Sequence, residues 1–238
     1  MRARSLSLFR SIALAGVGLA LPLAALADPL GSGKYLVDTG LLFTLFFITL
    51  GPLKLLGPFA QATRRLDAGT LRALAFKAAV IAIAALLAGG LIGRALAVKW
   101  MVPMGALQFT AGLIFFLVAL KGVLAQYEVA QPASPEAAPP QPMRIAFPML
   151  VTPYGIAAVI LLLSMSADAE RTETTFAMLA LVMLLNLLAM IFVRFIMRPG
   201  VVAVLQVLAA VLGVMQVSLS VTIMLGALRM LGVVAAAT

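Results

Sequence analysis

Long apolar runs dominate this sequence and leave few folds open to it. A helix needs about 20 apolar residues to cross a bilayer, and residues 74–92 form one of several runs near that length. Of the 238 residues, 64 % are hydrophobic and 11 % are charged, whereas about a quarter of the residues in soluble domains are charged. The runs are too long for the alternating strands of a membrane β-barrel. The sequence therefore predicts an all-α polytopic membrane protein.

The chain lacks the residues of common enzyme and cofactor sites. It contains no His and no Cys, so the usual ligands of zinc and haem and the usual thiol nucleophile are missing. No predicted span holds an Asp or Glu at its centre. We therefore expect no enzymatic activity, no cofactor and no metal site.

The net charge of +9 comes from 17 basic and 8 acidic residues. The basic residues, such as Arg64 and Arg194, lie mostly at the ends of apolar runs and do not form a patch with interleaved aromatic residues. This placement is typical of membrane topology and not of a nucleic-acid interface. We therefore expect the lipid bilayer, and no nucleic acid, as a partner.

Residues 1–27 resemble a secretory signal peptide. Arg2, Arg4 and Arg10 supply a positive segment, a short apolar segment follows, and Ala25-Leu26-Ala27 supplies a small-x-small cleavage pattern. The alternative is an uncleaved helix that anchors the chain. Cleavage would place the amino terminus of the mature multi-pass protein outside the cytoplasm.

Six spans are predicted in the mature chain. They cover residues 35–60, 74–92, 104–124, 145–165, 176–195 and 201–225. Residues 28–124 hold the first three spans, residues 125–144 form a Pro-rich cytoplasmic linker, and residues 145–238 hold the last three. Lys and Arg are more frequent in the loops that this orientation places in the cytoplasm, as the positive-inside rule requires.

The two halves share weak landmarks. Pro52 and Pro148 are 96 residues apart, and Pro58 and Pro153 are 95 apart. Because three spans is an odd number, the second repeat must enter the membrane in the opposite sense to the first. Inverted repeats of three spans are typical of transporters. The alternative is a chance self-alignment of Ala/Leu-rich sequence.

Both Pro/Gly motifs are candidate binding sites. A proline inside a helix removes a backbone donor, and the freed groups must be buried in protein or line a wet cavity. Helix amino termini after Pro58 and Pro153 would direct partial positive charge at a ligand. The predicted site residues here are Pro52, Lys54, Gly57, Pro58, Thr152, Pro153, Tyr154 and Gly155. The alternative is a pair of packing kinks.

Four polar side chains in the predicted spans complete the candidate site. Lys54 is the ionisable residue well inside a span. It could bind a substrate carboxylate or extend to the cytoplasmic interface. Gln108, Asn186 and Gln206 can each donate and accept hydrogen bonds, which suits the ammonium of a zwitterion and equally suits contacts between helices.

The motifs resemble those of the MarC family of integral inner-membrane proteins, which implies a periplasmic amino terminus for the mature protein. The resemblance rests on residues 52–59, 103–112, 145–148 and 152–157 and covers residues 36–231. It implies a six-span bacterial protein related to the lysine-exporter type of transporter, and some members are described as small neutral amino acid permeases. We therefore expect a secondary transporter of small neutral solutes such as amino acids. A non-transporting assembly or regulatory subunit is the alternative, and homo-oligomer formation is left open.

Overall fold

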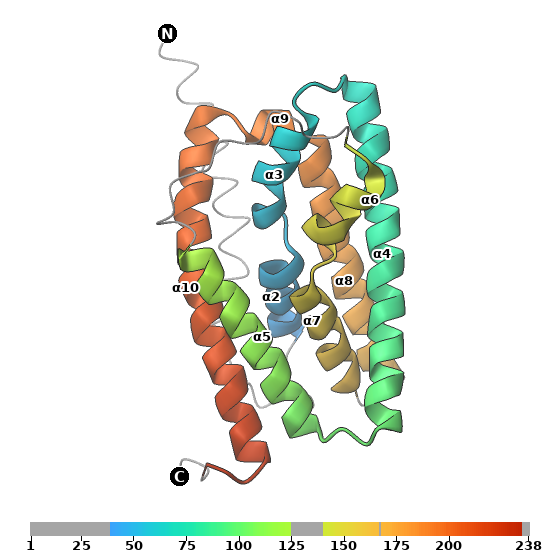
Figure 1. Cartoon of the computed structure of the whole chain (residues 1–238), viewed down its shortest axis with the longest axis vertical. Coiled ribbons are helices and arrows are strands. Elements are labelled where there is room, and N and C mark those ends of the chain that lie inside the picture. The colour runs from blue at the N-terminus through green and yellow to red at the C-terminus, as the bar shows by residue number, and fades with distance from the viewer. Residues whose placement is uncertain (1–38, 125–139, 167, 235–238) are drawn as a thin grey trace.

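The computed structural model describes residues 39–124, 140–166 and 168–234, which form helices and the turns between them (Figure 1). The predicted signal peptide and residues 125–139 of the predicted linker lie outside the described residues. The linker was predicted to extend to residue 144, but a short helix already begins at Pro142. Proline suits the first helical position because an N–H at that position would have no partner within the helix.

The described segments contain nine helices and one π-helical turn, which together form the membrane spans. They are α2 (Thr39–Leu50), α3 (Leu53–Thr63), α4 (Ala68–Lys99), α5 (Met104–Leu124), α6 (Pro142–Arg144), η2 (Ile145–Leu150), α7 (Pro153–Ser164), α8 (Ala169–Ile191), α9 (Val193–Ile196) and α10 (Pro199–Met230). Among the described residues, five spans are long and apolar enough to cross a membrane, and one of them is formed by α2 and α3. Counting the bent unit of α6, η2 and α7 as one span gives up to six. The prediction of an all-α polytopic membrane protein is confirmed.

Aspartate caps set the starts of α4 and α8. The Asp67 carboxylate accepts a hydrogen bond from the Thr70 amide at 2.9 Å, and Asp168 accepts one from the Arg171 amide at 2.8 Å. Hydrogen bonds from Thr70 hold the pKa of Asp67 below its ordinary value of 3.8. Both helices begin several residues before the predicted spans, because an apolar run marks only the part of a helix that suits lipid.

The two halves run in opposite directions. In Figure 1 the first span, formed by α2 and α3, runs upward, α4 runs downward and α5 upward, whereas α7 runs downward, α8 upward and α10 downward. Contacts between the halves recur when each helix is replaced by its counterpart in the other half. The contact between α4 and α7 corresponds to the contact between α8 and α2, and the contact between α5 and α7 corresponds to the contact between α10 and α3. This arrangement agrees with an inverted repeat.

Small residues allow the helices to approach closely. A Cβ atom added to Gly90 of α4 would collide with Val159 of α7, and one added to Gly112 of α5 would lie 2.7 Å from Cγ of Met224 on α10. Glycines at such contacts are typical of helix packing in membranes. The α4–α7 and α5–α10 contacts therefore depend on glycines, which carry no side chain, as well as on apolar side chains.

Candidate functional site

Both Pro/Gly motifs interrupt a span. The first break separates Leu50 at the end of α2 from Leu53 at the start of α3, and the second separates Leu150 from Pro153. The second break bends its span by 65°. Pro52 has no N–H, so the carbonyl of Ile48, four residues earlier, lacks the donor that a continuous helix would supply.

The structure corrects the register of the repeat. The breaks are 100 residues apart, from Leu50 to Leu150, and not the 95 or 96 that the proline spacing predicted. A helix amino terminus was predicted after Pro58, but Pro58 lies inside α3, which begins directly after Pro52. The reason is that a proline can precede a helix, begin one or lie within one. Aligning the prolines of the two halves therefore does not align their helix breaks.

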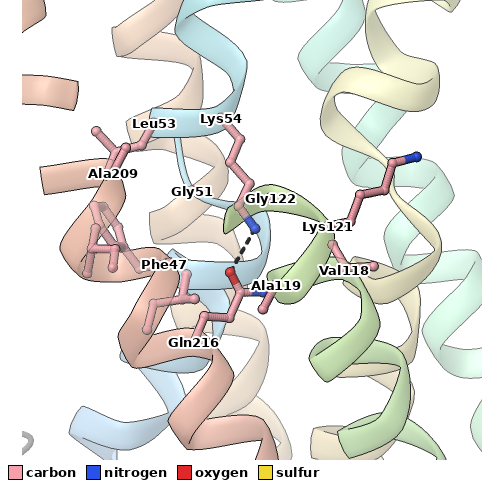
Figure 2. A pocket seen from close by; sticks show the side chains of 13 residues that line it. Phe47, Gly51, Leu53, Lys54, Val118, Ala119, Lys121, Gly122, Ala209 and Gln216 are labelled. Atoms are coloured by element: carbon pink, nitrogen blue, oxygen red, sulfur yellow. Dashed lines mark hydrogen bonds between the residues drawn. The ribbon is translucent and has the colours of Figure 1, made fainter. Parts of the chain in front are cut away.

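A pocket of about 480 Å³ opens beside the first break, between α2, α3, α5 and α10 (Figure 2). Its lining residues are Phe47, Ile48, Gly51, Leu53, Lys54, Val118, Ala119, Lys121, Gly122, Ala209, Leu212, Gly213 and Gln216. Lys54, Lys121 and Gln216 are the polar members of this set. The pocket is therefore an apolar chamber with a few polar groups, as small-molecule sites commonly are.

Lys54 points across this pocket toward α10. Its Nζ donates a hydrogen bond to Oε1 of Gln216 at 2.9 Å (Figure 2). The same Nζ lies 4.9 Å from the centre of the Tyr154 ring, within the range of a cation–π interaction. Lys54 and Tyr154 come from the two different motifs, one residue after the start of α3 and of α7. The Lys54 side chain therefore joins α3 to α10 at the pocket, and the choice between a ligand role and an extended position at the interface stays a prediction.

Gln216 was not among the predicted site residues. Its side chain is 4 % exposed, and its Nε2 has no hydrogen-bond partner among the described residues. Gln206, which was predicted, is exposed on the same helix and is not among the residues that line the pocket. The signal that the sequence offered for Gln216 was its polarity within an apolar run.

Asn186 and Gln108 join helices and do not line the pocket. Asn186 is fully buried on α8, and its Nδ2 donates to the carbonyl of Leu50, the last residue of α2, at 2.6 Å. Nε2 of Gln108 on α5 donates to the carbonyl of Ile223 on α10 at 3.2 Å. Of the two roles that the sequence left open for these residues, the structure shows contacts between helices.

The second motif shapes the start of α7. The hydroxyl of Thr152 accepts a hydrogen bond from the amide of Gly155 at 3.2 Å and caps the helix. Gly155 is buried, and a Cβ atom there would collide with Leu50. The two breaks therefore lie against each other. Of the motif residues predicted for the site, Lys54 lines the pocket and Pro58 is exposed. The residues that are not among its lining are Pro52, Gly57, Pro58, Thr152, Pro153, Tyr154 and Gly155.

Together these features define a polytopic helical membrane protein with two broken spans of opposite direction beside a pocket. Residues 37–231 match the family described as MarC family integral membrane protein. The chain belongs to the MarC family, and the resemblance found in the sequence is confirmed. Searches of curated proteins and of solved structures gave no significant match.

Proposed function

We propose that this protein is a secondary transporter of small neutral solutes, with zwitterionic amino acids as the leading class, in the bacterial inner membrane. One observation carries the proposal: two broken spans of opposite direction meet beside a pocket into which Lys54 projects. In many secondary transporters, discontinuous helices at the interface of inverted repeats form the substrate site.

The pocket offers partners for both ends of a zwitterion. Lys54 supplies an ammonium group that attracts a carboxylate. Ile48 lines the same pocket, and its carbonyl lacks a donor at the residue four positions later because that residue is Pro52. A freed carbonyl can accept a hydrogen bond from the ammonium of the solute. The remaining lining is mostly apolar, which suits a short aliphatic side chain.

Solute flux tests the proposal. The full chain, reconstituted in proteoliposomes and loaded with unlabelled alanine or glycine, is expected to exchange it for the labelled amino acid in a saturable manner. Protein-free liposomes give the background rate. A folded, monodisperse protein that shows no saturable flux of any small neutral amino acid would contradict this function. A stable partner that co-purifies in that case would favour an assembly or regulatory subunit.

A further inference from the structure

We infer that Lys54 and Gln216 form a carboxylate-binding subsite, so that the pocket requires the carboxylate of its solute and only tolerates the ammonium. This inference rests on the proposed function, since it assigns a head group to the solute of the same pocket. It extends that function by naming the substrate class as small carboxylates with a short apolar substituent, whether or not they carry an amine.

The first support is the charge of Lys54. Its Nζ has three donors, and Gln216 Oε1 accepts one of them. The Tyr154 ring lies near the ammonium but offers a π face and no negative charge. No Asp or Glu is among the described residues that line the pocket. A charge within a span is costly without a counter-ion, and an anionic ligand would provide one.

The second support is the unpartnered amide of Gln216. The side chain is 4 % exposed, and Nε2 has no partner although Oε1 is bound to Lys54. Buried donors in proteins are normally paired. A carboxylate has lone pairs for both groups, so one carboxylate can accept from Lys54 Nζ and Gln216 Nε2 together. The two donors come from α3 and α10, whose side chains meet at the pocket (Figure 2).

The third support is the absence of a matching site for a cation. Apart from Lys54, Lys121 and Gln216, the residues that the structure places around the pocket carry no polar side chain. A freed backbone carbonyl can accept from an ammonium but brings no charge. The amine of the solute therefore contributes less to binding than the carboxylate, whose charge opposes that of Lys54.

Three probes of similar size separate the head groups. L-Alanine carries both groups, propionate only the carboxylate, and L-alaninamide only the amine. With the full chain in nanodiscs, calorimetry is expected to show binding of alanine and propionate, with L-alaninamide weaker by roughly ten-fold or more. Equal binding of L-alaninamide and L-alanine would overturn the subsite, and so would the failure of L-alanine or of propionate to bind.

Substitutions test the two residues. Lys54→Met and Gln216→Leu are each expected to weaken propionate binding by roughly ten-fold or more, because each removes a donor to a charged group. Gln206→Leu removes an exposed amide from the same helix. Lys99→Met removes a charge at the exposed end of α4, away from the residues that line the pocket. Both controls are expected to change binding by less than about three-fold.

Equal losses in Lys54→Met and Lys99→Met would overturn the subsite, because they would indicate a general positive potential. Should Lys54→Met fail to fold, Lys54→Arg retains the charge and is expected to keep binding propionate better than L-alaninamide, and loss of that preference would contradict the assignment. Propionate binding without any amino acid flux would support the subsite and contradict the proposed transport function. If L-alaninamide inhibits alanine flux as strongly as propionate does, the subsite is contradicted but the transport function is not.

Discussion

At the residue scale, Lys54 is an exposed residue whose ammonium contacts neutral groups on two other helices. Gln216 accepts its hydrogen bond at 2.9 Å, and the ring of Tyr154 lies 4.9 Å away. Neither group neutralises the charge, so the ammonium remains available to a solute.

Replacing Lys54 tests this role in transport. Lys54→Met is expected to lower alanine flux by roughly ten-fold or more, because it removes a charged donor from the solute, while expression and monodispersity stay unchanged. Lys99→Met, at the exposed end of α4, is the matched control and is expected to transport normally. Unchanged flux in Lys54→Met would show that the charge serves no transport role.

Asn186 stabilises the first break and not the solute. Asn186→Leu removes the donor to the Leu50 carbonyl, and a buried acceptor left unpaired costs about 1–3 kcal/mol. We expect a lower melting temperature in detergent, measured by fluorescence of the single Trp. Ser218→Ala removes an exposed hydroxyl bonded within its own helix and is expected to melt as the native protein does. Equal melting temperatures for both variants would contradict a stabilising role for the hydrogen bond from Asn186 to Leu50.

At the element scale, the sequence indicated both motifs as candidate helix breaks, with packing kinks as the alternative, but did not predict where each helix begins. Pro52 precedes α3, Pro153 begins α7 and Pro148 lies within η2. A proline specifies only which backbone donor is missing. The residue that begins the next helix depends on groups such as the Thr152 hydroxyl, whose capping role needs the local backbone conformation. Proline spacing alone therefore gave a register of 95 or 96 in place of 100.

Gln216 shows a second limit of sequence reasoning. A helix that is apolar on every side has no preferred face, so the sequence of α10 did not fix which residues turn toward α3. Gln206 and Gln216 were equivalent on polarity alone, and the packing of α10 against α5 decides that Gln216 lies at the pocket. By contrast, Lys54 was predictable, because a charge inside a span is rare and commonly functional.

The contact between α4 and α7 depends on glycine. Gly90→Ala is expected to lower the melting temperature, because the added Cβ would collide with Val159 and lie 3.1 Å from Leu163. Gly200→Ala, where a Cβ meets open space, is expected to be neutral or stabilising, since alanine favours a helix by about 1 kcal/mol over glycine. Thermal unfolding of both variants checks the prediction, and a stabilised Gly90→Ala would contradict it.

At the scale of the whole molecule, opposite directions of the two halves follow from an odd number of spans in each repeat. The sequence predicted this arrangement from counting, and the reversed paths of corresponding helices agree with it (Figure 1). The paired contacts α4–α7 and α2–α8 show that the likeness extends to packing. The orientation in the bilayer stays a prediction that depends on the proposed signal peptide and on loop charge.

Cysteine labelling tests that orientation, because the chain has no cysteine of its own. Arg65→Cys lies between α3 and α4, and Val102→Cys lies between α4 and α5. With the mature amino terminus in the periplasm, a membrane-impermeant maleimide is expected to label Val102→Cys in intact cells and Arg65→Cys only after permeabilisation. The reverse pattern would contradict the orientation but not the fold.

The most direct test of the transporter assignment places a reactive group in the pocket. Ala209 is exposed and lines the pocket on α10, so Ala209→Cys offers the one thiol in the chain. In proteoliposomes, an anionic methanethiosulfonate is expected to abolish alanine flux through Ala209→Cys, and alanine is expected to slow the modification. Val102→Cys is the control and is expected to keep its flux after modification. Flux through fully modified Ala209→Cys, or modification that alanine does not slow, would show that solutes do not pass through this pocket.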